Sequence, residues 1–231
     1  MNNTEFLTRQ KHLLEKMQPN SICLVPASNL VTRSRDTEYP FRQDSYFQYL
    51  CAFPEPEAWL VLSNHQEYSK GLCVLFCLDK DPTMEIWHGR RTGLSQAKQQ
   101  YPVNMAFALE ELDEQLLDLI DGHQNIYFAQ GHNPDADDLV FSLLQALRDA
   151  PKQSKEAPSS LIDVRIILDE MRLIKSANEI DMMRQAAATA TQAHIRAMKF
   201  VEAGKNEYHL EAEIHHEFAM QGAKYPAYGT I

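Results

Sequence analysis

Residues 71–78 read GLCVLFCL, a nearly continuous apolar run with the length of one β-strand. Successive side chains of a strand point to opposite faces of its sheet, so a strand that is apolar throughout is buried on both faces. We therefore expect this segment to be a central strand. A sheet of this kind needs other elements packed on both of its faces.

The segments on either side of this run alternate between two periodicities. Short apolar runs bounded by turn residues predict strands, and stretches with apolar residues every three or four positions predict helices. The predicted strands are residues 21–26, 58–62, 83–87 and 125–129. The predicted helices are residues 4–18, 94–100, 108–120 and 136–150, with one more strand and helix within 161–171. The alternation predicts an α/β domain, in which helices pack on a sheet.

The last quarter of the chain has a different pattern. Residues 151–160 are polar and read as a linker or surface loop. Ser176 and Glu179 then form a capping box that begins a long helix, and a second amphipathic helix follows Asn206. Residues 225–231 are extended and apolar. Because about 55 residues form a marginal core at best, we expect the beginning of a second domain that is cut off.

Composition excludes several classes of protein. The 231 residues hold 22 Lys and Arg against 32 Asp and Glu, a net charge of -10, and such a chain repels nucleic-acid phosphates. No run approaches the roughly 20 apolar residues that cross a bilayer, and the N-terminus has no apolar signal core. We expect a cytoplasmic protein that binds neither nucleic acid nor membrane. Its four cysteines lie in apolar surroundings and are expected to be free buried thiols: Cys23, Cys51, Cys73 and Cys77.

One predicted helix is rich in side chains that can bind metals. The group is His209, Glu211, Glu213, His215, His216 and Glu217. Glu213 and His216 form one Glu-x-x-His pair, but a di-iron bundle needs a second pair and two more Glu on partner helices. The order also differs from the His-Glu-x-x-His of zinc proteases. We interpret the group as a solvated helix face. We assign no metal ligand and no catalytic residue to this chain, which also lacks a Gly-x-Ser-x-Gly elbow.

Trp87 stands directly before His88, Gly89, Arg90 and Arg91. An aromatic ring beside two guanidinium groups can form a recognition surface. The alternative is a half-buried Trp with solvated arginines, and spacing alone favours this second interpretation.

Six segments carry a resemblance when they are taken in order. They are TRSRDTEYPFRQDS at 32–45, FPEPEA at 53–58, EIWHGRR at 85–91, EMRLIKS at 170–176, YHLEAEIHHEF at 208–218 and YPAY at 225–228. Together they resemble aminopeptidase P of the pita-bread metallopeptidase family. The set spans nearly the whole chain, and its order makes it specific.

The resemblance implies a fold and a reaction. Residues 1–172 resemble the family's N-terminal α/β domain, a mixed sheet flanked by helices that helps to shape the substrate entrance and builds the oligomer. Residues 173–231 resemble the opening helices of an incomplete pita-bread α+β catalytic domain. In the complete enzyme two divalent metals, usually manganese, share a hydroxide that attacks the carbonyl preceding a proline and releases the N-terminal residue. The family's ligands, two Asp, one His and two Glu, are expected beyond residue 231, so this chain alone is expected to be inactive.

The resemblance also gives Trp87 a role. It matches a family tryptophan that reaches toward a neighbouring subunit's active site, so we expect it to bind substrate as an interface anchor. Asp36 falls in a matching loop near that contact. The expected partners are peptides with proline at the second position and further copies of the chain. Two alternatives stay open: a non-catalytic module for assembly or peptide capture, and a prolidase relative, because the junction at 172–180 is shared across the wider family.

Overall fold

The computed structural model describes residues 3–150, 152, 154–224 and 226–230. Its internal contacts divide the chain into two compact units, Met1–Met171 and Arg172–Ile231. This division lies one residue from the boundary expected between residues 172 and 173. Each unit is described by itself below.

The first unit is built on a mixed six-stranded sheet with the order β6-β5-β4-β1-β7-β8. The strands are β1 (Ser21–Pro26), β4 (Trp59–Ser63), β5 (Leu72–Cys77), β6 (Met105–Ala108), β7 (Asn125–Phe128) and β8 (Ser160–Asp163). Strand β4 runs antiparallel to both β1 and β5, and the remaining pairs are parallel. All six residues of β5 are buried, which confirms it as an internal strand.

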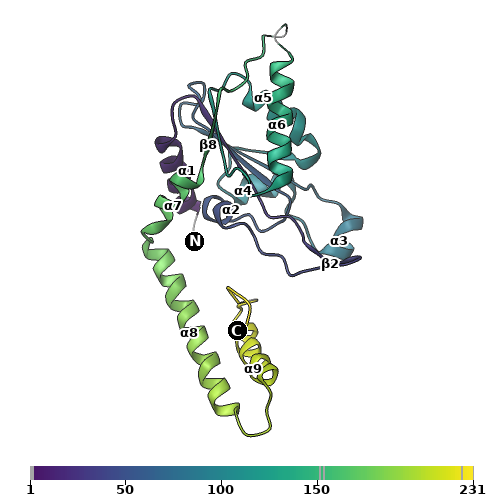
Figure 1. Cartoon of the computed structure of the whole chain (residues 1–231), viewed down its shortest axis with the longest axis vertical. Helices are drawn as coiled ribbons and strands as arrows, with labels where there is room; N and C mark the ends of the chain where they lie inside the picture. Colours follow the sequence, from purple (N-terminus) through teal and green to yellow (C-terminus); the bar gives the residue numbers. More distant parts are fainter. Residues whose placement is uncertain (1–2, 151, 153, 225, 231) are drawn as a thin grey trace. The chain divides into compact units, whose positions relative to one another are not determined.

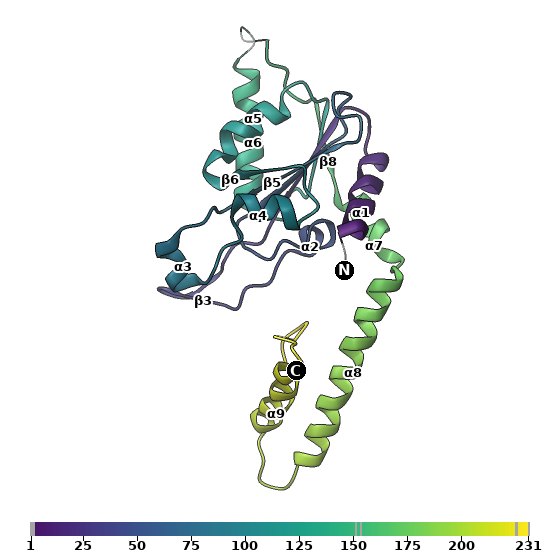
Figure 2. The same cartoon turned by 180° about the vertical axis from the view of Figure 1, so that it is seen from behind.

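Helices cover both faces of this sheet. They are α1 (Asn3–Lys16), α2 (Ser45–Leu50), α4 (Gly93–Gln100), α5 (Leu112–Ile120), α6 (Pro134–Arg148) and α7 (Arg165–Leu173), with a 3-10 turn η1 (Leu109–Glu111) before α5. Alternate residues of β1 enter two separate cores, Cys23 on one face and Ile22 on the other. Helices α1 and α7 lie across the sheet from α5 and α6 (Figures 1 and 2). The predicted α/β class, a mixed sheet flanked by helices, is confirmed.

The predicted strand at residues 83–87 is wrong, because this segment is the helix α3 (Pro82–His88). The Asp81 carboxylate accepts hydrogen bonds from the amides of Thr83 and Met84 at 2.9 and 3.1 Å. Pro82 occupies the first turn, and Gly89, with φ of 86°, ends the helix. Capping therefore decides this segment, because the side-chain oxygen and the proline both stabilise a helix N-terminus.

Two further segments differ from the sequence prediction. The polar, charge-dense composition of residues 32–44 predicts a loop, but the stretch contains a short hairpin, β2 (Thr32–Ser34) and β3 (Thr37–Glu38). The predicted helix at 108–120 begins later, since Ala108 ends strand β6. Strand β6 is a half-buried edge strand of four residues, too short to give a clear periodic signal.

The second unit consists of two helices that pack on each other, α8 (Ala177–Phe200) and α9 (Glu207–Met220). The predicted capping box is confirmed: the Ser176 amide donates to the Glu179 carboxylate, and the Glu179 amide donates to the Ser176 hydroxyl. Only Ala193 and Ala197 are buried among the residues of α8. No strand is formed over residues 226–230, and the ends of the predicted extended segment, 225 and 231, lie outside the described residues. Within the described part of the chain, no helix is long and apolar enough to span a membrane.

Candidate functional site

Trp87 lies in an excursion of the chain between β5 and α4. We call residues 79–94, which contain α3, the α3 loop. Its two ends are joined: the Arg91 guanidinium donates to the Asp79 carbonyl at 3.0 Å, and the Leu94 amide donates to the Asp79 carboxylate at 3.3 Å. The loop is therefore closed at its base and leaves the sheet as one compact projection.

Helix α3 places its large apolar side chains in solvent. Trp87 is 80% exposed and Ile86 is 77% exposed, and no residue of α3 is buried. The interpretation of Trp87 as a half-buried ring is therefore wrong. The exposed indole of Trp87 is therefore accessible to a partner molecule.

The β2–β3 hairpin adds to the same projection. It lies beside α3 in both views of the chain (Figures 1 and 2). Val31 and Tyr39 are 61% and 53% exposed at its base, where the Tyr39 amide donates to the Val31 carbonyl at 2.9 Å. We call Val31, Tyr39, Ile86 and Trp87 the arm surface. Large apolar side chains that are exposed on one part of a protein can mark a contact site.

The tip of the hairpin is polar. Arg35 adopts a left-handed backbone with φ of 49°, and Asp36 follows it at the turn with its side chain exposed. Arg33, Arg35, Arg42 and Arg90 are exposed and form no ion pair within the described residues. On a chain of net charge -10 the hairpin is close to neutral, because Asp36 and Glu38 balance Arg33 and Arg35, so it repels an acidic surface less than the rest of the chain does.

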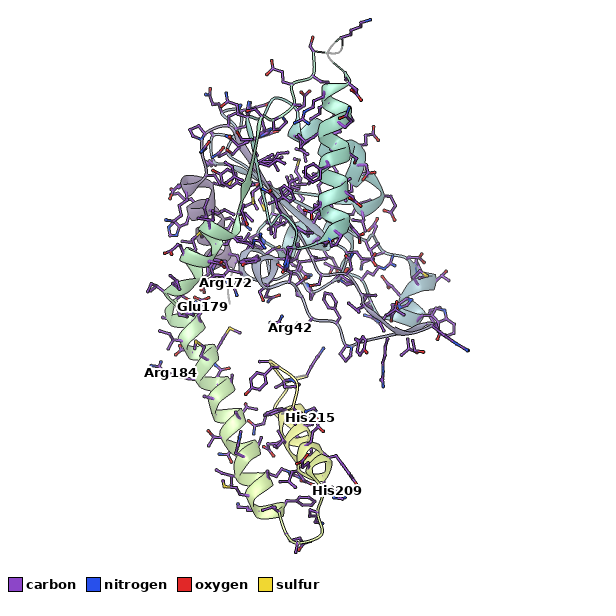
Figure 3. All side chains as sticks on the ribbon, viewed as in Figure 1. Arg42, Arg172, Glu179, Arg184, His209 and His215 are labelled. Atoms are coloured by element: carbon purple, nitrogen blue, oxygen red, sulfur yellow. The ribbon has the colours of Figure 1, made fainter. Side chains whose placement is uncertain are left out.

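Two carboxylates of α9, those of Glu213 and Glu217, join it to α8. The Arg196 guanidinium lies 2.5 Å from the Glu213 carboxylate and 3.7 Å from that of Glu217. His209 accepts a hydrogen bond from the Asn206 amide at 3.1 Å, and His209 and His215 lie at different levels of the helix (Figure 3). No group of three or more His, Cys, Asp or Glu in the described residues could hold a metal ion.

A groove of about 530 Å³ lies between α8, α9 and the segment that follows α9. Its walls are mostly apolar and include Ala190, Ile214 and Phe218, with His194 and His215 among them. The Thr230 hydroxyl donates to the Glu211 carboxylate at 2.6 Å and holds the last described residues against α9.

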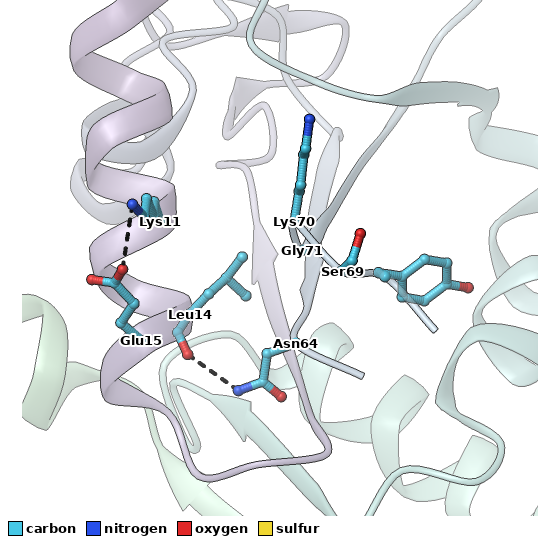
Figure 4. A pocket seen from close by; sticks show the side chains of 8 residues that line it. Lys11, Leu14, Glu15, Asn64, Ser69, Lys70 and Gly71 are labelled. Atoms are coloured by element: carbon cyan, nitrogen blue, oxygen red, sulfur yellow. Dashed lines mark hydrogen bonds and ion pairs between the residues drawn. The ribbon is translucent and has the colours of Figure 1, made fainter. Parts of the chain in front are cut away.

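A second pocket, of about 560 Å³, lies in the first unit between α1 and the turn before β5 (Figure 4). Its polar groups already have partners in part: Lys11 lies 3.6 Å from Glu15, and the Asn64 amide donates to the Leu14 carbonyl at 3.1 Å. Gly71 has φ of 78°, and a Cβ there would collide with Leu14. We read this pocket as a packing feature of the α1 contact.

Comparison with known proteins defines the class to which this architecture belongs. A model described as "Aminopeptidase P, N-terminal domain" matches residues 6–127, and one described as "Metallopeptidase family M24" matches residues 181–231. The fold is thus an aminopeptidase P N-terminal domain joined to M24 metallopeptidase sequence. The chain belongs to the aminopeptidase P family.

Several relatives share this sequence. The chain is 46% identical to the Xaa-Pro aminopeptidase of Escherichia coli K12 over 98% of its own length and 51% of that protein. It is 37% identical to the Haemophilus influenzae Xaa-Pro aminopeptidase, covering 98% of this chain and 50% of that protein. The structure of E. coli aminopeptidase P in a low-pH form matches with a TM-score of 0.96 at 45% identity, over 100% of this chain and 52% of that one. The chain therefore spans about half the length of the curated relatives it matches.

Proposed function

We propose that this chain supplies the N-terminal domain and the first catalytic-domain helices of a manganese-dependent Xaa-Pro aminopeptidase. Such an enzyme removes the N-terminal residue that precedes proline in a peptide. The observation that carries the proposal is the 46% identity to the E. coli Xaa-Pro aminopeptidase over 98% of this chain. A cytoplasmic location, and the absence of nucleic-acid partners, stay predictions from the sequence.

The metal is proposed from the family alone. The M24 match makes this a metallopeptidase family, and one structural relative is described as zinc-substituted E. coli aminopeptidase P in complex with product. The described residues of this chain do not fit a metal centre, because none of them form a group of three or more ligating side chains. We therefore derive no catalytic step within these residues, and the proposal assigns them no metal ligand.

Within the complete enzyme, Trp87 is proposed as the substrate-binding residue of this chain. Its 80% exposure leaves the indole free to contact a peptide or a second subunit. Tyr and Trp dominate such contacts because they bury much apolar area at low conformational cost. The nearly neutral hairpin would repel an acidic partner less than the rest of the chain does, and another copy of this acidic chain is one. We propose a homo-oligomer in which the arm surface, with Asp36 near the contact, reaches a neighbouring active site.

A chimera tests the proposal. This chain would be joined, at the aligned position, to the second half of the E. coli relative. With manganese added, the folded chimera should release the first residue from an Xaa-Pro tripeptide, and chelation should abolish the release. The 231-residue chain alone should release nothing.

Other outcomes would favour the alternatives. Turnover restricted to Xaa-Pro dipeptides would indicate a prolidase relative. A folded, metal-loaded chimera that binds peptides without turnover would indicate a non-catalytic capture module and would contradict the proposal.

A further inference from the structure

Hydrogen bonds hold most of the α3 loop in place, and its apolar packing is confined to its end, where Leu94 contacts the core. No residue of α3 is buried, so burial of apolar area contributes little to its position. Its internal hydrogen bonds include the Asp81 cap at the start and a bond from the Arg91 amide to the Glu85 carboxylate at 3.3 Å. These bonds shape the loop, but they leave its orientation on the sheet unspecified.

Glu55 supplies the connection to the rest of the unit. Its Oε1 accepts a hydrogen bond from the Thr92 amide at 2.6 Å. Among the described residues, Thr92 joins residues 80–92 to residues outside the α3 loop, through this bond and through a side-chain hydrogen bond with Tyr101. A bond to a carboxylate is shorter and stronger than one between neutral groups.

The backbone of Glu55 is fixed in turn by Gln43. The Gln43 side-chain NH₂ donates to the carbonyls of Glu55 and Phe53, both at 3.0 Å. Its oxygen accepts from the amides of Ser28 and Asp44, both at 2.9 Å. Gln43 is only 9% exposed, and this amide uses its full hydrogen-bonding capacity. Gln43 closely follows the β2–β3 hairpin in sequence and bonds to the Glu55 carbonyl, and the α3 loop bonds to the Glu55 carboxylate. Glu55 therefore connects the hairpin and the α3 loop.

The charge of Glu55 is only partly compensated. Its second oxygen, Oε2, is buried and has no hydrogen-bond partner among the described residues. Burial of an ionised oxygen without a partner costs stability. The Glu55 carboxylate therefore strengthens its hydrogen bond to Thr92, while its buried Oε2 lowers the stability of the fold.

We infer that Glu55 is a positioning residue that fixes the α3 loop, and with it the Trp87 indole, in the orientation needed for contact. The inference rests on the proposed role of Trp87. The test uses the 231-residue chain without peptide. Its result therefore does not depend on whether Trp87 recognises substrate.

Amide hydrogen exchange and the indole NMR signals measure this positioning. Trp59, which is 9% exposed, provides a buried reference for Trp87. In Glu55→Ala, the amides of residues 83–92 should exchange roughly tenfold faster or more, the scale expected for losing a charge-assisted bond. The Trp87 indole signal should narrow while that of Trp59 stays unchanged. Glu55→Gln should recover part of the protection that Glu55→Ala loses, because its side-chain carbonyl can accept from Thr92 in a weaker, neutral bond.

Two further variants make the test decisive. Glu57→Ala removes the same charge from an exposed side chain two residues away and should leave exchange in α3 unchanged. Thr92→Pro deletes the donor amide at a residue whose φ of -64° suits proline. It should speed amide exchange in α3 as Glu55→Ala does. It also tests the inference if Glu55→Ala does not fold. Wild-type exchange of α3 in Thr92→Pro, or an equal rise in β4 and β5, would overturn the inference.

Discussion

Ser63 and His123 lie 2.7 Å apart, measured from Oγ to Nε2, at the end of strand β4. His123 is 6% exposed, and its Nδ1 is buried without a hydrogen-bond partner among the described residues. The Ser63 oxygen also accepts from the His65 amide at 3.1 Å. Burial, and secondarily the nearby His65, lower the pKa of His123 below its ordinary value. The folded chain therefore holds this histidine neutral.

A neutral buried histidine makes stability depend on pH. Below about pH 6.5 the unfolded chain binds a proton that the folded chain resists, so the free energy of unfolding should fall as the pH drops. Between pH 7 and 5.5, wild type should lose up to about 1 kcal/mol more than His123→Gln, which cannot titrate. Denaturant unfolding at several pH values measures this, with the exposed His12→Gln as control. Equal pH slopes in wild type and His123→Gln would contradict the assignment.

The four cysteines are free and buried, as expected from the sequence. Burial raises the pKa of both Cys51 and Cys77 to about 12, and it also raises those of Cys23 and Cys73. Because the thiolate is the reactive form, a maleimide or disulfide reagent should label the native chain very slowly and all four thiols together once it unfolds. Mass spectrometry across a denaturant series measures the labelling. Rapid modification of one thiol in native buffer would show that the core opens locally there.

Arg196 should contribute to the packing of α9 on α8. Its guanidinium side chain is 38% exposed and that of Glu213 is 24% exposed, so their ion pair is only partly screened. Arg196→Met should lower the stability of this helix pair by about 1 kcal/mol. Arg184→Met is the matched control, because Arg184 pairs with Asp181 within α8 at the surface. It should lower the stability of the helix pair by less than about 0.5 kcal/mol. Amide exchange in α9 measures both, and equal effects would contradict a role for the Arg196 contact between the helices.

Manganese should bind this chain no better than it binds any acidic surface. A tight site needs several oxygen or imidazole ligands at fixed geometry, and the described residues hold no group of three. Titration calorimetry should show weak heats without defined stoichiometry. A tight site of defined stoichiometry that disappears in His216→Ala would show that α9 binds metal after all.

The predictable parts of this fold are those with strong periodic or capping signals. The apolar run of β5 and the Ser176 capping box identify their elements directly, because many residues or two reciprocal bonds act together. The sequence prediction gives a strand in place of helix α3, because the apolar residues of this segment resemble those of a short strand. Asp81 and Pro82, however, are a typical helix N-terminal signal. The Gln43–Glu55–Thr92 connection could not be predicted, because it joins residues that only the tertiary fold brings together. For Trp87, the spacing alone favours a half-buried ring, which is wrong, and only the family resemblance predicts a contact role.

The central claim is that Trp87 recognises substrate from outside the catalytic domain. In the chimera, Trp87→Ala should lower the specificity constant for longer Xaa-Pro peptides. The free energy lost should be about 1–3 kcal/mol, the range for removing an aromatic anchor. Metal content should be unchanged, and the melting temperature should barely move because the ring is 80% exposed. Phe141→Ala, at an aromatic side chain of α6 that is 53% exposed and lies outside the arm surface, is the matched control and should keep the activity. The most direct measurement is therefore the specificity constant together with the melting temperature in Trp87→Ala. We expect a large fall in the specificity constant with little change in the melting temperature. An unchanged specificity constant with a large drop in melting temperature would contradict a role of Trp87 in substrate recognition.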